Sequence, residues 1–231
     1  MVMKSMELSF KQKLSTIIFK LIVIISAIIG IILSAIKSDA FMGGRTVFMY
    51  FTIQSNILIA VICFIGLGLV LLKSKANNIW SVIKLVSTIS ITLTGLVFTF
   101  VLAPALGNDA WSLNNVLTHA VVPVAAVIDF FIVGVHLSLK KKDVFFVVIP
   151  PLMYVIYAGI GYAADWKFTK TANYPYFFLN YGSSAGAFGF SSSLPYMGVV
   201  WWILFLLLLL IGLGFLYLKI IDLLKKKYSN D

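Results

Sequence analysis

Long apolar runs alternate with short polar segments along the chain. Most of the runs exceed about 18 residues, the length at which a continuous apolar stretch is expected to cross a bilayer as a helix. They lack the alternation of apolar and polar positions that marks the strands of a membrane barrel. The pattern predicts one all-α domain over residues 1–231, a polytopic bundle of six transmembrane helices at residues 17–36, 46–72, 80–103, 113–137, 144–164 and 196–220.

Two features interrupt this regular pattern. Pro150 and Pro151 lie in the first half of the fifth run, where proline removes a helical hydrogen bond, so we expect a bend there. The connection 165–195 before the last run is long and rich in Tyr, Phe, Ser and Gly. It has two interpretations, an aromatic loop lying at the membrane interface or a lid over an outward-facing cavity.

The composition is that of a membrane protein. Of the 231 residues, 61% are hydrophobic and 11% are charged, and the mean hydropathy is +1.04. Soluble domains contain about 25% charged residues. The net charge of +10 would suggest a nucleic-acid partner in a soluble protein, but here the charges fall in short loops and tails, where they meet lipid headgroups. We therefore expect a membrane lipid as partner, and no nucleic acid.

The positive charges divide unequally between the two sides of the predicted bundle. Loops on the cytoplasmic side carry more Lys and Arg, so the side with 14 of the 18 is predicted to be cytoplasmic, together with both termini. The Lys-rich and Ile-rich composition suggests a multi-pass protein of a bacterial plasma membrane. The richer side holds Lys4, Lys11, Lys13, Lys20, Lys73, Lys75, Lys84, Lys140, Lys141, Lys142, Lys219, Lys225, Lys226 and Lys227, and the other holds Lys37, Arg45, Lys167 and Lys170.

The fourth run carries ionisable residues at bilayer depth. His119 is the only histidine deep within an apolar run, and Asp129 lies ten residues further on. Such groups are costly in hydrocarbon and by default indicate a functional site. On a helix, Asp129 lies about 15 Å beyond His119 and about 80° off its face, so direct contact between them is not expected. Asp129 is expected to bind Lys84 or a polar residue of the third run, or to line a proton path.

The second run offers polar partners for His119. Thr52, Ser55 and Asn56 follow the i, i+3, i+4 spacing that places side chains on one helix face. Thr52 and His119 each lie six residues into their predicted runs, about 9 Å below the outer start, and this equal depth allows them to pair. The hydroxyls and the amide suit a nucleophile and oxyanion donors, and neutral imidazole suits a general base. The alternative is ordinary interhelical hydrogen bonding.

Pro123 follows His119 by one turn and frees the histidine carbonyl from its helical bond. The third run carries a stripe of small and polar residues from Thr88 to Thr99, typical of close helix packing, with a cavity wall as the alternative. Cys63 is the only cysteine, and the sequence contains no metal-ligand, phosphate-loop or dinucleotide motif. We therefore expect no metal and no cofactor.

Three motifs and the six-helix layout resemble a known family. The motifs are YFTIQSNIL around Thr52, THAVVPVAAVIDF around His119 and YPYFFLN around Tyr176. They resemble the androgen-induced gene family of multi-pass membrane threonine hydrolases, which cleave fatty acid esters of hydroxy fatty acids, and its bacterial branch. The resemblance covers nearly the whole chain and implies Thr52 as nucleophile and His119 as base. Asn56, Asp129 and Tyr176 match motif positions of the bacterial branch without an assigned role.

Two functions therefore follow from the sequence. The first is an intramembrane hydrolase of lipid carboxyl esters, in which Thr52 attacks, His119 takes its proton, and Ser55 or Asn56 stabilises the oxyanion. The second is a non-enzymatic membrane protein that binds or transports a lipid or another small molecule in the same polar pocket. A purely structural role, with a dry and fully packed bundle, is a third possibility.

Overall fold

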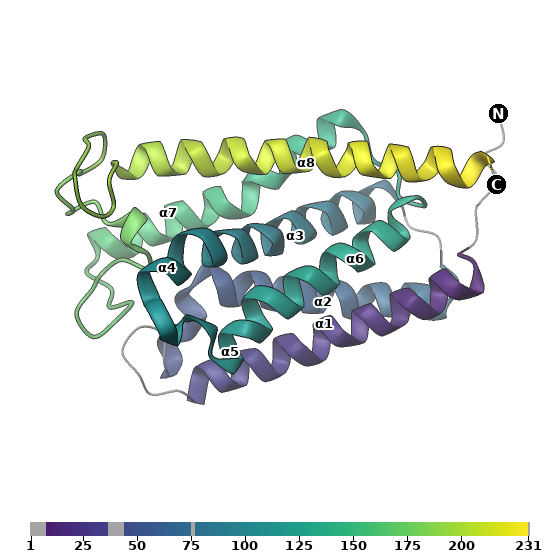
Figure 1. The fold of residues 1–231 in the computed structure, drawn as a ribbon, viewed down its shortest axis with the longest axis horizontal. Coiled ribbons are helices and arrows are strands. Elements are labelled where there is room, and N and C mark those ends of the chain that lie inside the picture. Colours follow the sequence, from purple (N-terminus) through teal and green to yellow (C-terminus); the bar gives the residue numbers. More distant parts are fainter. Residues whose placement is uncertain (1–7, 37–43, 75–76, 231) are drawn as a thin grey trace.

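The computed structural model describes residues 8–36, 44–74 and 77–230. This part of the chain is all-helical, with six helical segments that are long and apolar enough to cross a membrane, as expected of a multi-pass membrane protein (Figure 1). Three of the charges used above to predict orientation, Lys4, Lys37 and Lys75, lie outside the described residues.

The six observed segments lie close to the predicted ones. The second starts later than expected, because Gly44–Met49 forms a 3-10 helix and Tyr50 has an extended backbone. The sixth continues beyond residue 220, since its basic end stays helical. The observed segments are α1 (Phe10–Ile36), α2 (Phe51–Leu71), Asn78–Leu106 with α3 (Asn78–Val97) and α4 (Ala103–Leu106), Leu113–Gly134 with α5 (Leu113–Val116) and α6 (Val122–Gly134), Lys141–Ala163 with α7 (Ile149–Ala163), and α8 (Val199–Asn230).

Prolines mark changes of helix type within three of these segments. Pro104 lies at the start of α4 and Pro123 at the start of α6, each directly after a π-helical turn, Phe98–Leu102 and Leu117–Val121. Proline has no backbone N–H to donate to the carbonyl four residues earlier. A wider turn before the proline shifts the hydrogen bonds of that turn, so that fewer carbonyls are left without a partner. In the fifth segment, Pro150 and Pro151 begin α7 after a 3-10 helix, where an absent N–H is harmless.

The third segment lies at the centre of the bundle. Helix α3 contacts α2, α6, α7 and α8, while α1 packs against α2 and α6 (Figure 1). The start of α1 and the end of α8 lie at the same end of the bundle (Figure 1). The central position means that polar residues on α3 reach partners on several helices.

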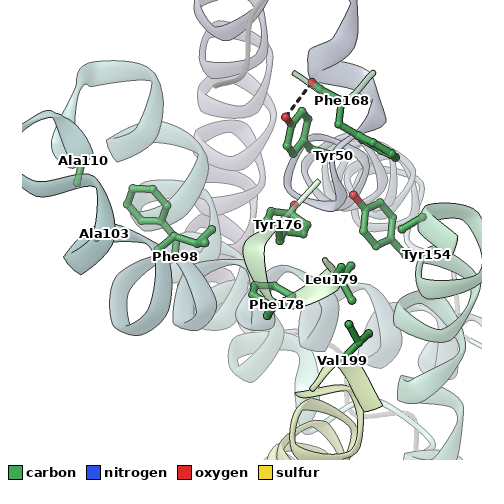
Figure 2. Packing of buried hydrophobic residues seen from close by; sticks show 12 residues of the cluster. Tyr50, Phe98, Ala103, Ala110, Tyr154, Phe168, Tyr176, Phe178, Leu179 and Val199 are labelled. Carbon is green, nitrogen blue, oxygen red and sulfur yellow. Dashed lines mark hydrogen bonds between the residues drawn. The ribbon is translucent and has the colours of Figure 1, made fainter. Parts of the chain in front are cut away.

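The connection between α7 and α8 folds onto the opposite end of the bundle. Its side chains Phe168, Tyr176 and Phe178 are buried and join an aromatic cluster with Tyr50 and Tyr154 (Figure 2). The phenol of Tyr50 donates a hydrogen bond to the Phe168 carbonyl at 3.0 Å. The part of the connection from 168 to 179 is therefore packed into the bundle, whereas Phe188 and Phe190 further along are 66% and 74% exposed.

A buried ion cluster joins three helices at the other end. Asp129 on α6 is fully buried, and one of its carboxylate oxygens accepts bonds from Lys20 and Thr16 of α1. Its other oxygen accepts a bond of 2.6 Å from Lys84 of α3. An interaction with Lys84 is one of the alternatives that the sequence predicts for Asp129, and this ion pair is present. Lys20 and Lys84 are 2% and 1% exposed, so counting them among the charges of the inner loops was wrong.

We expect Asp129→Asn to destabilise the bundle strongly. The variant leaves two buried ammonium groups without a counter-charge, and removing one member of a buried ion pair costs about 3–5 kcal/mol. Asp165→Asn is the matched control, because its ion pair with Lys167 is exposed and contributes little. Unfolding by sodium dodecyl sulfate, followed by circular dichroism, measures both. Equal midpoints for the two variants would contradict a stabilising role of the cluster.

Candidate active site

A small cavity lies at the end of the bundle that the α7–α8 connection covers. Its volume is about 60 Å³. Apolar side chains of α2, α3, α7, α8 and the connection form most of its wall. Four hydroxyl-bearing residues interrupt that wall, namely Thr52, Thr94, Tyr154 and Tyr176, and the Tyr154 hydroxyl donates to the Met49 carbonyl. The cavity is thus apolar with one polar region, the arrangement typical of small-molecule sites.

Thr52 lies in the first turn of α2. Its backbone N–H donates to the Tyr176 hydroxyl at 3.3 Å, and its own hydroxyl oxygen lies 3.4 Å from the same phenol oxygen. Tyr50, the residue directly before α2, makes no side-chain capping bond to the helix. The Tyr176 phenol instead satisfies one of the N–H groups that the first turn leaves without a helical partner. Thr52 is the second residue of its helix rather than the seventh, because the helix starts at Phe51.

Tyr176 reaches Thr52 from the α7–α8 connection and is held by aromatic contacts (Figure 2). Its ring stacks on Phe178 at 5.1 Å between centroids and meets Tyr50 edge-on at 5.8 Å. Burial raises the pKa of the Tyr176 phenol. The phenol therefore stays protonated, accepts from the Thr52 N–H and keeps its own proton for donation to a neighbouring oxygen.

Ser55 and Asn56 lie on the same buried face of α2 as Thr52, in agreement with their spacing. The Ser55 hydroxyl donates to the Thr52 carbonyl at 3.0 Å and lies 2.7 Å from the Thr94 hydroxyl. The Asn56 amide donates to the carbonyls of Thr52 at 2.8 Å and Thr118 at 3.1 Å. Both N–H groups of Asn56 are thus engaged and none is left for an oxyanion, whereas its carbonyl oxygen has no partner in the described part of the chain.

His119 lies in the π-helical turn Leu117–Val121 and is 5% exposed. Its Nδ1 lies 3.1 Å from the Asn115 carbonyl oxygen and 3.0 Å from the Thr118 hydroxyl. A carbonyl only accepts, so Nδ1 carries the proton. The neutral ring then has an unprotonated Nε2, which is the form that a general base requires. The ring stacks on Phe98 with 3.8 Å between centroids.

Helix α3 packs closely against the backbone at His119. A methyl group added at Gly95 would lie 3.0 Å from the His119 carbonyl oxygen and 3.1 Å from Cβ of Pro123. Close approach at a glycine is the packing that a stripe of small residues predicts. Thr88 and Thr92 of the same stripe donate to carbonyls four residues earlier on α3. The stripe therefore serves helix packing, and Gly95 sets the position of the histidine turn.

The two predicted catalytic residues are close in the fold but are not hydrogen bonded. The Asn56 side chain joins the turn of Thr52 to the turn of His119 through Thr118. In residues 8–36, 44–74 and 77–230, however, no hydrogen bond links Thr52 with His119, and His119 is not among the residues that line the cavity. The Thr52–His119 pair stays a prediction.

Of the six candidate residues, four gather around the cavity and two lie apart from it. Thr52 and Tyr176 line it, and Ser55 and Asn56 bond to the Thr52 carbonyl. His119 lies behind Asn56 and Thr118, and Asp129 belongs to the ion cluster. Sequence reasoning missed Thr94, whose signal was only one more hydroxyl in a Ser- and Thr-rich helix. No cluster of three potential metal ligands occurs among the described His, Cys, Asp and Glu residues.

Comparisons with protein-family models, with curated proteins and with solved structures give no match for this chain. The resemblance to the androgen-induced gene family therefore stays a hypothesis that rests on three short motifs.

We expect Gly95→Ala to destabilise the protein by about 1–3 kcal/mol, because the added methyl group forces the His119 carbonyl and Pro123 away from α3. Gly68→Ala is the matched control, since no atom lies within 4 Å of the added methyl group and alanine favours a helix more than glycine. Thermal unfolding in detergent compares the two variants. A similar loss of stability in both would show that the contact between Gly95 and the histidine turn is unimportant.

Proposed function

We propose that this protein is an intramembrane hydrolase of lipid carboxyl esters, with fatty acid esters of hydroxy fatty acids as one candidate substrate class. The observation that carries the proposal is the Thr52 hydroxyl in an apolar cavity, 3.4 Å from a buried phenol. An apolar cavity suits an acyl ester, a threonine hydroxyl is a possible nucleophile, and a phenol proton is a possible donor to the ester oxygen.

The reaction proposed is acyl transfer in two steps. The Thr52 oxygen attacks the ester carbonyl while its proton passes to Nε2 of His119, and the oxyanion accepts a hydrogen bond from Tyr176. The ester C–O bond then breaks, the alcohol leaves with the proton from His119, and an acyl-threonine is formed. Water attacks this second ester with His119 again as base, which releases the fatty acid and restores Thr52.

This mechanism requires His119 to approach the Thr52 hydroxyl when substrate is bound. The Nδ1–H bond to the Asn115 carbonyl supports it, because this bond leaves Nε2 as the basic atom. Catalytic hydrogen bonds are often long in the free enzyme and tighten with substrate. Tyr176 takes the donor role first expected for Ser55 or Asn56, because the Ser55 hydroxyl donates to the Thr52 carbonyl and both N–H groups of Asn56 are occupied.

A second candidate is a membrane protein that binds a lipid or another small molecule without cleaving it. The missing hydrogen bond between Thr52 and His119 favours this alternative, as does the absence of His119 from the cavity wall among the described residues. Substitution at Thr52 separates the two. A nucleophile tolerates only Thr52→Ser, whereas a binding site responds alike to Thr52→Ser and Thr52→Ala.

The proposed location is the plasma membrane of a bacterium, with both termini in the cytoplasm. The start of α1 and the end of α8 lie at one end of the bundle (Figure 1). The basic residues 225–227 form part of the helical end of α8, and Lys225 donates to the Leu137 carbonyl, shortly before the basic residues 140–142. The positive-inside rule places such an end in the cytoplasm even without the buried Lys20 and Lys84. The cavity with Thr52 then faces the outer half of the bilayer.

We expect a lipid-like fluorophosphonate to label the wild-type protein and to leave Thr52→Ala and His119→Ala unlabelled. Loss of the nucleophile removes the reacting atom, and loss of the base leaves a hydroxyl that is too weakly nucleophilic to react. Thr92→Ala is the matched control, because Thr92 is a threonine of α3 that bonds to Tyr217 away from the cavity. In-gel fluorescence measures labelling, and size-exclusion chromatography confirms folding. Labelling that survives Thr52→Ala would place the nucleophile elsewhere.

We expect Tyr176→Phe to slow fluorophosphonate labelling and ester cleavage, because it removes the oxyanion donor and keeps the ring. Loss of one such donor lowers turnover on the order of 10²-fold. Tyr50→Phe is the comparison, since that phenol donates to the Phe168 carbonyl and not into the cavity. Initial rates with a fluorogenic long-chain ester test the difference. A Tyr176→Phe protein with unchanged turnover would leave the donor unassigned.

A further inference from the structure

A groove on the outside of the bundle runs between α2, α3 and α7. Its volume is about 310 Å³. Polar groups of Gln54, Ser55 and Ser90 and the side chains of Met153 and Tyr157 contribute to its wall. Gln54 is exposed and Met153 is 66% exposed, so the groove is open to the surroundings of the bundle. Both α2 and the segment of α7 are membrane-spanning lengths, and the groove therefore faces lipid.

The groove and the cavity with Thr52 are neighbours. Phe51 and Tyr154 line both spaces. Their rings meet edge to face with 5.3 Å between centroids. Ser55 lines the groove and Thr94 lines the cavity, and the hydrogen bond of 2.7 Å between their hydroxyls crosses the same partition. The two aromatic rings thus belong to the walls of both spaces and separate the groove from the cavity that holds the proposed nucleophile.

Helix α7 is attached to the bundle along a narrow strip. Its buried residues are Pro151, Tyr154, Ala158 and Gly161. The rest of the helix is largely exposed, with Met153 among these exposed residues. The groove is therefore bounded on one side by a helix of which only one strip is buried against the bundle. In a bilayer, lipid hydrocarbon chains would cover the open side of the groove.

The sizes of the two spaces indicate how a lipid would divide between them. A buried water needs about 10–15 Å³ of such volume, so the cavity of about 60 Å³ has room for a small polar group but not for a long chain. The groove is about five times larger and is continuous with the bilayer. An ester group in the cavity would leave its chain outside it, and the adjoining groove has room for that chain.

We infer that the acyl chain of a lipid enters laterally from the bilayer between α2 and α7, and that Phe51 and Tyr154 form the gate. Displacement of these two rings joins the groove to the cavity, so that the chain lies in the groove while its carbonyl reaches Thr52. This inference rests on the proposed function and narrows its substrate class to membrane-dissolved long-chain esters, in place of water-soluble esters.

The test uses a long-chain ester with a photoreactive diazirine next to its carbonyl, added to the protein in lipid nanodiscs. Mass spectrometry of peptides locates the adducts after irradiation. We expect adducts in the cavity-lining segment 174–180, reduced about fivefold by Met153→Trp, because the indole fills the groove. The matched control is Ile156→Trp, on the same helix, 63% exposed and outside both spaces, and it leaves the adducts unchanged.

A second pair of variants tests the gate itself. Tyr154→Ala removes one of the two rings and is expected to raise the yield of adducts in segment 174–180 severalfold. Tyr154→Phe keeps the ring, removes the bond from the hydroxyl to the Met49 carbonyl, and is expected to give a yield well below that of Tyr154→Ala. Equal yields in Tyr154→Ala and Tyr154→Phe would overturn the assignment of the gate.

Two results would overturn lateral access. One is an equal yield in Met153→Trp and Ile156→Trp, and the other is a lack of adducts in segment 174–180 of the wild type. Adduct formation needs binding but no turnover, so Thr52→Ala is expected to retain it. Adducts without fluorophosphonate labelling would thus refute the hydrolase activity and keep the lateral route. Fluorophosphonate labelling that is unchanged in Met153→Trp would refute the lateral route and keep the hydrolase activity.

Discussion

The carboxylate of Asp129 is the interaction on which the bundle depends most. It is fully buried and binds ammonium groups from α1 and α3, which makes it the charged junction of three helices. A charge at that depth is tolerable only when its partners are in place, so the cluster selects one mutual arrangement of α1, α3 and α6. The same span carries His119 nearer the other end, and its position is set in part by this junction.

At the other end of the bundle, the position of His119 is set by irregular helical backbone. Pro123 begins α6 directly after the π-helical turn that carries His119, the His119 ring stacks on Phe98, and Gly95 lets α3 approach the His119 carbonyl closely. Departures from regular helix inside a membrane persist only where the protein itself satisfies them. Here they leave a neutral imidazole with its proton on Nδ1, near the first turn of α2, where the Tyr176 phenol accepts from the Thr52 N–H.

The α7–α8 connection links these features to function. It closes one end of the bundle with an aromatic cluster and delivers the Tyr176 hydroxyl to Thr52 (Figure 2). A space with an apolar wall and hydroxyls from α2, α3 and the connection suits an ester with a hydrocarbon chain better than it suits an ion or a water-soluble solute. Under the proposed lateral route, the groove beside α7 would let the bilayer supply such molecules.

The sequence by itself determined the six spans, their approximate limits and the shared face of Thr52, Ser55 and Asn56, because continuous apolar runs in hydrocarbon satisfy their backbone as helices and helical spacing is local. Only the tertiary structure decided the partners. Lys20 meets Asp129 across 109 positions, and Tyr176 meets Thr52 across 124. Such contacts depend on which helices are neighbours and on where each helix begins. The periodicity of a single segment determines neither. Lys20, which the sequence suggested to be a charge of the inner side, is therefore buried, and Tyr176, a loop residue without an assigned role, accepts from the Thr52 N–H.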